Sequence, residues 1–506
     1  MAKETKVYDY KPEAVRDRLA AEFRRHKGEA TVADLVARTG FAKHQVETEV
    51  RAVSDEYGAR LRVTESGEIL YSFPRGLHSR YRGLGPSLKR TWKALRKGAS
   101  AVAAFVFKIW IVVMLVGYFV LFIALALAAM AASIAAQTAG GRDSRDRGHG
   151  GGGGLLLTGR VLDIFLRIWL YGELFKGPEQ RYHDRQRRAT RSRERRPLHR
   201  AVFSFVFGDG DPNEPWDETE KKAVAAFIQS NRGVISLEEF MVLTGHRPLE
   251  AEDAINRYLY EFEGSPEVTD NGTIYYFFPA LLRRKDERDR SLGSSAGSLA
   301  PMKRTVPFSA NPKKANFWFA ALNGVNLAFG SFFLANALTR GIPLLPPGAE
   351  AIPADFYIIV TVLVSQVTAY PLAAILWGLG FVPAAFAVLF YLVPFVRSLR
   401  LGRTNEEIKR QNLRRLVYAR AWADPERVNP ADAQTRDDSV RPKDGKTAEK
   451  TVEELAAWAG GNPGTGGTWT FPELARRKAD IEAARRKVRT EDYALGGAVF
   501  DSEGPS

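Results

Sequence analysis

Residues 30–74 read ATVADLVARTGFAKHQVETEVRAVSDEYGARLRVTESGEILYSFP, and residues 235–279 read ISLEEFMVLTGHRPLEAEDAINRYLYEFEGSPEVTDNGTIYYFFP. The two stretches align without a gap at a constant offset of 205 residues. Identical positions include the Thr-Gly pairs 39–40 and 244–245, and the series Gly67, Ile69, Tyr71, Phe73, which matches Gly272, Ile274, Tyr276, Phe278. A repeat of this length indicates that one folded module occurs twice in the chain.

Each copy carries the pattern of two helices followed by two short strands. In the first copy, Val32, Leu35 and Val36 share one helix face, and Gly40 stands where a helix commonly ends. The strands alternate apolar and polar residues around a turn, which in the second copy contains the hairpin signal Asn271-Gly272. Helices expected over 12–25 and 218–231 would precede the two copies, and three helices closed by a hairpin predict a winged helix.

The charge of the second helix in each copy bears on DNA binding. The stretch 41–56 carries two basic and four acidic residues, and 247–263 carries two basic and five acidic residues. Contacts from Lys and Arg to phosphates supply most non-specific DNA affinity, so acidic reading helices would oppose binding. This pattern favours modules that contact proteins, with DNA binding as the alternative.

Long apolar stretches predict membrane helices. Ile109–Gln137 is uncharged and longer than the roughly 20 residues needed to cross a bilayer core. Further candidates are Asn316–Leu338, Phe356–Trp377 and the shorter Phe381–Val396, where Pro383 and Pro394 predict a broken or shallow element. The formal charge of +15 gathers at 80–97, 181–200 and 397–420, beside these stretches, as is typical of the cytoplasmic flanks of membrane helices.

One crossing at 109–137 cannot place both of the first two basic clusters on the cytoplasmic side. Leu155–Phe175 is the candidate for a return crossing, but Arg160, Asp163 and Arg167 form one charged stripe on it. The stripe favours an amphipathic helix in the membrane interface, and a second span is the alternative. Arg142–Gly154 and Ser291–Ala300 have the composition of flexible linkers.

The composition excludes several kinds of site. The chain has no cysteine, so disulfides, zinc–thiolate sites and cysteine-ligated iron–sulfur clusters are excluded. Its seven histidines lack ligand spacing, no nucleophile–base pair appears, and the amino-terminal stretch lacks the apolar core of a cleavable signal peptide. We therefore expect no enzyme activity, no cofactor and no small-molecule substrate, and we assign no catalytic, cofactor-binding or metal-binding residues.

Residues 201–215, AVFSFVFGDGDPNEP, begin a pattern that imitates a calcium loop. Asp209, Asp211, Asn213, Asp217 and Glu220 fall at ligand positions of an EF-hand loop. Glu214 stands in place of the required glycine, and no suitable helix precedes the loop. The pattern favours a turn in which Asp217 caps the next helix and Glu220 completes a capping box.

These observations predict a mainly α chain with small β-hairpins, two winged-helix-like domains and transmembrane helices. The expected parts are winged-helix-like domain 1 (1–79), a basic flank and transmembrane helix (80–140), a segment with the Gly linker, an amphipathic helix and Arg-rich residues (141–200), winged-helix-like domain 2 (201–285), a linker (286–314), two or three membrane helices (315–400), a basic amphipathic helix (401–424) and a largely disordered tail (425–506) with short helices near 452–459 and 472–487.

Three stretches resemble a known family: YGARLRVTESGEILYSFP (57–74), AVFSFVFGDGDPNEP (201–215) and NEEIKRQNLRRLVYARA (405–421). With the separated pair of modules, they resemble integral membrane proteins of chloroplasts and cyanobacteria that are often described as an iron–sulfur cluster biosynthesis family. The resemblance implies a membrane protein of uncharacterised activity. The absence of cysteine gives the iron–sulfur description no chemical support, because the chain offers no thiolate ligand.

The functional expectation is therefore an integral membrane protein whose modules form a membrane-anchored platform for protein interaction or assembly. Its partners would be the lipid bilayer and one or more proteins. The Arg- and Ala-rich composition favours a bacterial inner membrane, with both modules on the cytoplasmic side. The alternative is a membrane-tethered, DNA-binding transcriptional regulator.

Overall fold

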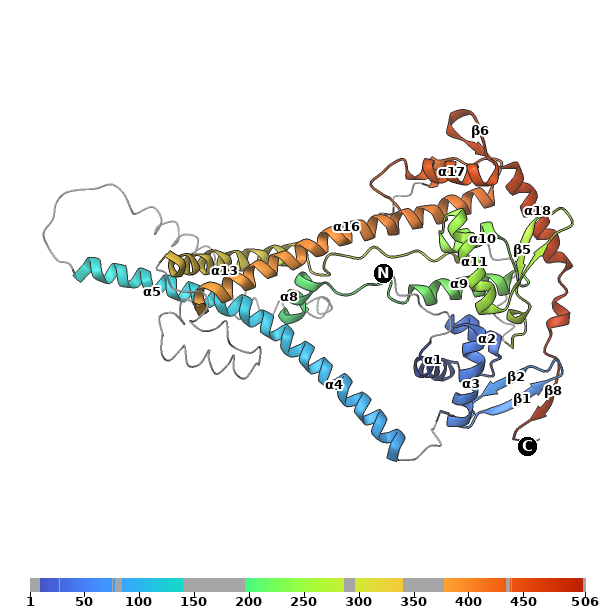
Figure 1. Cartoon of the computed structure of the whole chain (residues 1–506), viewed down its shortest axis with the longest axis horizontal. Helices are drawn as coiled ribbons and strands as arrows, with labels where there is room; N and C mark the ends of the chain where they lie inside the picture. The colour runs from blue at the N-terminus through green and yellow to red at the C-terminus, as the bar shows by residue number, and fades with distance from the viewer. Residues whose placement is uncertain are drawn as a thin grey trace, which may run out of the picture. The chain divides into compact units, whose positions relative to one another are not determined.

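The computed structural model describes residues 10–26, 28–74, 76–77, 84–139, 196–285, 296–339, 377–433, 437 and 439–503. The chain is mainly helical with small sheets (Figure 1), and it forms two compact units. The module unit comprises Met1–Trp92, Asp211–Val306 and Gly402–Ser506. The apolar unit comprises Lys93–Gly210 and Pro307–Leu401.

The first module contains the expected three helices and hairpin: α1 (Pro12–Arg25), α2 (Val32–Thr39), α3 (Lys43–Tyr57), β1 (Arg60–Thr64) and β2 (Ile69–Ser72). A capping box begins α2, because the Thr31 hydroxyl accepts from the Asp34 N–H while the Asp34 carboxylate accepts from the Thr31 N–H. Gly40 ends α2 at a φ of 75°, a left-handed conformation that favours glycine.

The second module repeats this order in α9 (Trp216–Ser230), α10 (Leu237–Thr244), α11 (Pro248–Phe262), β4 (Ser265–Val268) and β5 (Ile274–Phe277). Ser236 and Glu239 form the equivalent capping box, and Gly245 ends α10 at a φ of 69°. A short strand, β3 (Val234–Ile235), adds to β5. The hairpins share one register, because Val63 faces Ile69 as Val268 faces Ile274.

The carboxyl-terminal tail is ordered over most of its length, so the prediction of a largely disordered segment over 425–506 is wrong for the described residues. It contains η5 (Pro430–Ala433), α17 (Thr447–Ala459), β6 (Asn462–Pro463), β7 (Trp469–Thr470), α18 (Pro472–Lys487), η7 (Thr490–Tyr493) and β8 (Ala498–Asp501). Buried apolar side chains such as Leu455, Phe471 and Ile481 give these elements the packing that their polar composition obscures.

The last strand returns to the first module. β8 pairs antiparallel with β1, which gives a three-stranded sheet in the order β2-β1-β8. Asp501 accepts hydrogen bonds from Arg60, and the Ser502 N–H donates to the Leu61 carbonyl at 2.9 Å. The tail therefore completes the hairpin sheet of the first module.

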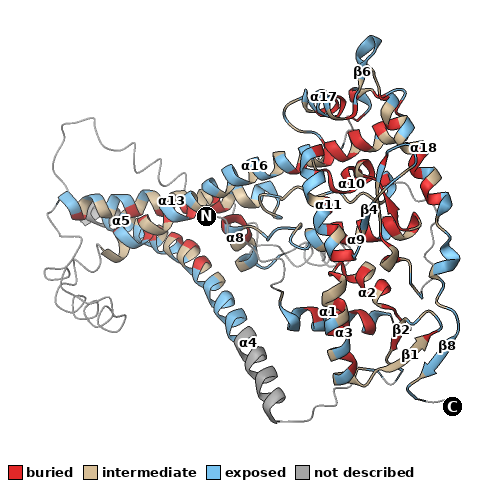
Figure 2. Cartoon of the chain, turned by 45° about the vertical axis from the view of Figure 1, so that its right-hand side comes forward, coloured by how far each residue is buried: buried red, intermediate tan, exposed pale blue. Residues whose placement is uncertain are grey.

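One continuous core joins the two modules and the tail within the module unit. Figure 2 shows its buried residues in red along α2, α9 and α10. The core includes Leu19 and Leu35 from the first module, Ile228 and Phe240 from the second, and Val452 from α17. Each Å² of apolar surface removed from water contributes about 25 cal/mol to stability. The shared core therefore stabilises the association of the two modules with the tail.

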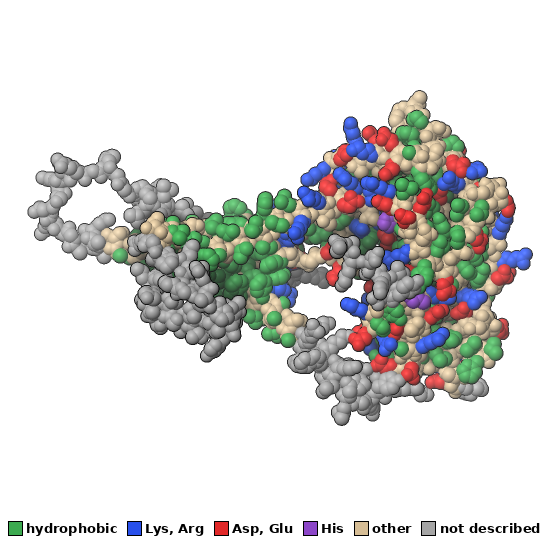
Figure 3. All heavy atoms as spheres, in the orientation of Figure 1, with side chains coloured by type: hydrophobic (Ala, Val, Ile, Leu, Met, Phe, Trp, Pro, Cys, Tyr) green, Lys and Arg blue, Asp and Glu red, His purple; other side chains and the backbone are tan. Residues whose placement is uncertain are grey.

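The apolar unit contains helices that can cross a membrane. They are α4 (Leu84–Val112) from Lys93 onward, η1 (Val113–Gly117) and α5 (Tyr118–Ala139), then α13 (Lys313–Thr339), and finally η4 (Trp377–Phe381) with the first half of α16 (Val382–Ala423). Among the described residues, three helical stretches are long and apolar enough to span: Gly98–Ser133, Lys313–Thr339 and Trp377–Ala423. Figure 3 shows hydrophobic side chains over this unit and mixed charges over the module unit.

The third late segment differs from its prediction. Phe381–Val396 was expected to be broken or shallow and to be separate from a basic helix at 401–424, but α16 runs through both. Pro394 lies inside the helix, and Pro383 follows closely after the π-helical turn η4. Residues 356–376, 140–154 and 155–175, which carry the other membrane and linker predictions, lie outside the described residues.

The α13 and α16 helices pack antiparallel at close range. A Cβ on Gly330 would lie 2.8 Å from the Ala384 nitrogen, and one on Gly380 would lie 2.8 Å from the Leu334 nitrogen. The Asn323 side chain donates to the Ala387 carbonyl at 2.9 Å. Small residues and interhelical hydrogen bonds are the usual means of helix association in lipid.

Candidate functional site: helices docked on the repeated turns

The repeated Thr-Gly turn of the first module is covered by a helix of the second. At Gly40, a Cβ would lie 3.0 Å from the Glu218 carbonyl oxygen and 3.3 Å from the Cβ of Lys221, so α9 packs directly on the glycine. An ion pair between Arg18 and Glu218 (3.1 Å) flanks the contact, but both side chains are over a third exposed, so it contributes little. The close approach requires glycine at this position.

The same turn in the second module is covered by α16. At Gly245, a Cβ would lie 2.8 Å from the Gln411 carbonyl oxygen and 3.0 Å from the Cγ of Arg415. The two copies therefore use one device twice: the turn after the second helix lacks a side chain, and another helix packs onto it.

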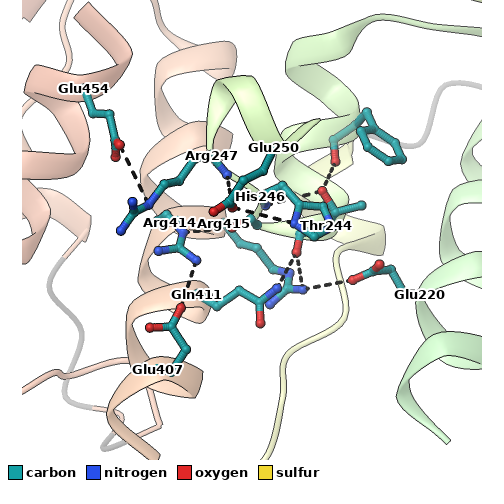
Figure 4. Close-up of polar contacts among 12 residues, drawn as sticks. Glu220, Thr244, His246, Arg247, Glu250, Glu407, Gln411, Arg414, Arg415 and Glu454 are labelled. Atoms are coloured by element: carbon teal, nitrogen blue, oxygen red, sulfur yellow. Dashed lines mark hydrogen bonds and ion pairs between the residues drawn. The ribbon is translucent and has the colours of Figure 1, made fainter. Parts of the chain in front are cut away.

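Arg415 is the centre of the second contact (Figure 4). Its side chain is fully buried, and it donates to the carbonyls of Leu243 (3.1 Å) and Thr244 (2.5 Å) at the carboxyl end of α10. A cation there meets the negative end of the helix dipole. Its guanidinium also pairs with Glu220 (3.4 Å), so the buried charge is compensated.

Neighbouring residues of α16 extend this contact, which we name the turn clasp: Gln411, Arg414 and Arg415 on the Thr244–Gly245 turn. Gln411 Nε2 donates to the Thr244 carbonyl at 3.0 Å, and Arg414 Nε donates to the Gly245 carbonyl at 2.8 Å. In each of these hydrogen bonds the acceptor on the turn is a backbone carbonyl. The clasp thus recognises the shape of the turn rather than its side chains.

Glu220 receives three donors, which explains its burial. The Trp216 indole (3.0 Å), the Tyr258 hydroxyl (3.3 Å) and Arg415 (3.4 Å) all point at its carboxylate. Burial, and next the charge of Glu220, raise the pKa of Tyr258 well above its ordinary value. The phenol therefore stays protonated and acts as a structural donor.

Three asparagines, two on α16 and one before α9, hold the extended residues 303–306. The Asn405 side chain donates to the Val306 carbonyl (2.9 Å) and accepts from the Val306 N–H (2.8 Å). Asn412 does the same with Lys303, at 2.8 and 3.0 Å. Asn213 does it with Arg304, at 2.7 and 2.9 Å. Residues 303–306 were expected to be a linker, but in each case an amide replaces the partner strand that an extended chain lacks.

These contacts give the two distinctive motifs a structural role. Asn213 comes from the GDGDPN run, and Asn405 and Asn412 come from the NEEIKRQNLRR run. The motifs lie far apart in the sequence, yet both hold residues 303–306. Their side chains act as architectural hydrogen-bonding groups in this arrangement.

The start of the GDGDPN run belongs to the apolar unit, so the expected domain boundary at 201 is corrected. Residues 201–207 lie in α8 (Leu198–Phe207), and the division between the units falls after Gly210. Asp209 accepts from the Ser204 hydroxyl (2.5 Å) and from the Ala310 N–H (2.8 Å). Its burial raises the pKa, but these bonds and Arg196 outweigh burial, and the net pKa is lowered.

The five residues of the calcium-loop pattern take separate roles. Asp211 accepts from the Asn213 N–H at 2.8 Å, and Glu220 faces Trp216, Tyr258 and Arg415. The predicted capping box is wrong: Pro215 occupies the cap of α9 without a side-chain bond, and Asp217 lies in the first turn. In the described part of the chain, no three His, Asp or Glu side chains are placed to hold a metal ion.

The surfaces that would read DNA contact other parts of the module unit. Lys43 of α3 pairs with Glu263 after α11 at 2.6 Å, and the Trp458 indole of α17 donates to Glu252 of α11 at 3.0 Å. The turn of the second hairpin is held by α18, where Asp480 accepts from Asn271 (2.7 Å) and Thr273 (2.6 Å). The hydrogen bonds that Thr273 and Asn271 donate lower the pKa of Asp480.

The sequence alone did not identify the clasp. Arg414 and Arg415 lie in a run of basic residues beside a membrane helix, where cations usually face lipid headgroups or water. The sequence did carry a signal for the separate asparagine contact, since Asn405 and Asn412 lie one heptad apart on one helix face and are therefore placed to touch one partner, residues 303–306.

Comparison with known proteins gives one distant similarity. An uncharacterised chloroplastic protein of Arabidopsis thaliana is 24% identical over 408 residues, which cover 78% of this chain and 70% of the relative. No family model matches the chain. No solved structure matches it either. The similarity is consistent with a chloroplast family of unknown function, and it carries no statement about iron–sulfur chemistry.

Proposed function

We propose that this chain is an integral membrane protein whose two modules, winged-helix variants, form one protein-docking platform without catalytic activity. The observation that carries the proposal is the turn clasp, since it fixes the second module to the helix that also contains a candidate membrane span. Buried side chains that hold a turn in a fixed geometry are what we expect of a scaffold protein.

The contacts within the apolar unit support a common membrane side for its chain ends. Lys108 lies over the Phe203 ring at 4.5 Å, and Arg397 donates to the carbonyls of Phe205 (2.9 Å) and Phe308 (2.7 Å). These contacts support the placement of the residues near 108, 205, 308 and 397 at the same end of the candidate membrane helices. The Lys and Arg residues at this end of the helices favour the cytoplasmic face of a bacterial inner membrane, or the equivalent face in a plastid.

The partner surface that we propose lies on the second module. Leu249 at the start of α11 is 72% exposed, and the cross-strand pair Val268 and Ile274 is 63% and 56% exposed. Val268 and Ile274 are partners on neighbouring strands, so their exposed apolar side chains adjoin each other, and contiguous exposed apolar surface marks interaction sites. The first module instead buries the corresponding edge of its hairpin against β8.

Site-specific photocrosslinking in the full chain, in native membranes, tests this proposal. A photoreactive residue at 249, 268 or 274 is expected to give an adduct with the same protein, identified by mass spectrometry. The control position is Thr48, which is exposed on α3, the equivalent helix of the first module. The platform proposal fails if the three positions give no adduct beyond that of the control.

A gel-shift measurement separates the platform from the DNA-binding alternative. The full chain in nanodiscs made without anionic lipid is expected to leave duplex DNA unshifted at low salt, because the candidate reading helices are acidic and engaged. A shift that weakens steeply with added salt would instead support the regulator.

A further inference from the structure

A cavity of about 880 Å³ lies in the module unit, apart from the clasp and the proposed partner surface. Its walls come from the end of α9, from α10, from α12 (Ala296–Leu299), from the last turns of α16 and from α18. Small residues of α12 and α16, such as Gly297, Ala419 and Ala423, leave the space open. The volume lies within the range of small-molecule sites.

The lining is strongly basic. Five cationic side chains face two carboxylates: Arg232, Arg420, Lys478, Arg485 and Arg486 against Glu239 and Glu482. Both carboxylates pair with the same residue, because Arg485 contacts Glu239 at 2.6 Å and Glu482 at 2.9 Å. Within the described ranges, the other four cations have no carboxylate partner, so the cavity carries uncompensated positive charge.

Arg485 is a built part of this wall rather than a surface cation. It is 7% exposed, and its Nε is buried without a hydrogen-bond partner among the described residues. A buried donor without a partner is costly, so this Nε is a hydrogen-bonding group that a ligand in the cavity would satisfy. Arg232 lines the same wall, and its Nη1 donates to the Arg485 carbonyl at 3.2 Å.

We infer that this cavity binds a small organic phosphate. The charge excess of the lining matches a multiply charged anion, and arginine guanidinium groups match the geometry of phosphoryl oxygens. The volume exceeds that of a free phosphate ion, and the half-buried Trp422 offers an apolar face to the remainder of the ligand. This inference does not rest on the proposed platform.

Calorimetric titration of the full chain in phosphatidylcholine nanodiscs with pyrophosphate and with ADP tests the site. Both probes are expected to bind, with ADP tighter because of Trp422. Arg420→Glu and Arg486→Glu should each weaken binding at least about tenfold, since each replaces an attraction with a repulsion. Arg476→Glu is the matched control: it reverses a charge on the same helix outside the cavity and should leave the affinity within about twofold.

The source of the phosphate is resolved by exchanging the lipid. If the cavity takes a lipid headgroup, nanodiscs that contain phosphatidylglycerol should reduce the apparent affinity for pyrophosphate in the wild type but not in Arg486→Glu. An unchanged affinity assigns the site to a soluble phosphate. The inference is overturned if neither probe binds up to about 10 mM at low salt, or if both charge reversals leave binding unchanged.

Discussion

The glycines of the two docked turns differ in one physical respect from the glycines of the two hairpins. All four have positive φ, but Gly67 and Gly272 have nothing within 4 Å of an added Cβ, whereas Gly40 and Gly245 face backbone at 3.0 and 2.8 Å. Alanine at the hairpin positions should cost about 1–2 kcal/mol of unfolding free energy from the left-handed conformation alone. Gly40→Ala and Gly245→Ala should cost a further about 1–3 kcal/mol, because a docked helix must shift.

Urea unfolding of the four purified variants, followed by tryptophan fluorescence, measures this difference. The hairpin variants are the matched controls, since they share the backbone strain and lack the contact. Equal losses for all four variants would show that the helices do not press on the turns.

The buried charge of Arg415 predicts a non-additive pair. Arg415→Met leaves Glu220 buried without its cation and should cost about 3–5 kcal/mol. Adding Glu220→Gln to that variant should recover part of the loss, because the uncompensated charge disappears. Arg410→Met, on an exposed position of the same helix, should stay close to the wild type. Additive losses in the urea midpoints of the pair would contradict the coupling.

His246, beside the clasp, predicts a pH dependence. Burial is the main cause of its lowered pKa; Glu220 and Glu250 oppose the shift, and Arg415 and Arg414 add to it. The folded protein therefore prefers the neutral imidazole. The resulting stability is present above the ordinary histidine pKa of about 6.5 and is lost as pH falls through the lowered value.

Urea midpoints of the wild type and of His246→Asn between pH 5 and 8 test this sign. The wild type should lose more stability than the variant as pH falls below about 6.5. Parallel curves would mean that His246 does not carry the dependence.

At the scale of elements, β8 predicts a local effect. A chain that stops after Leu495 lacks the strand that pairs with β1, and it lacks Asp501, whose pKa the hydrogen bond from Arg60 holds at about 2. Amide hydrogen exchange should accelerate in β1 and β2 and stay unchanged in β4 and β5, which serve as the internal control. Unchanged exchange in β1 would mean that the strand contributes nothing to the sheet.

The elements show which parts of the fold the sequence can predict. The bounds of α1, the ends of α2 and α10 at glycine and the shared hairpin register follow from periodicity and turn chemistry, which act locally. The tail and the clasp depend on contacts between residues far apart in the chain, such as Asp480 with Thr273 and Arg415 with Thr244. Composition describes such segments as polar, and only their partners make them ordered.

At the scale of the whole molecule, the module unit predicts a single membrane side. Both modules and the tail share one core, so positions in all three should face one compartment. The chain has no cysteine, so Thr48→Cys, Asn256→Cys and Glu453→Cys each supply a single, exposed label. A membrane-impermeant maleimide added to sealed vesicles should either label all three cysteines or label none of them. Vesicles opened with detergent, in which every cysteine is accessible, are the control. Labelling from opposite sides would contradict the shared unit.

The docking of the two turns has no twofold symmetry, because a helix of the second module fills the turn of the first while α16 fills the turn of the second. Head-to-tail contacts of this kind extend into open filaments unless something ends the series. Here α16 covers the turn of the second module, so neither repeated turn is open to a helix of another copy. We therefore expect α16, besides holding the second module, to keep the α9 helix of a neighbouring copy from docking on this turn.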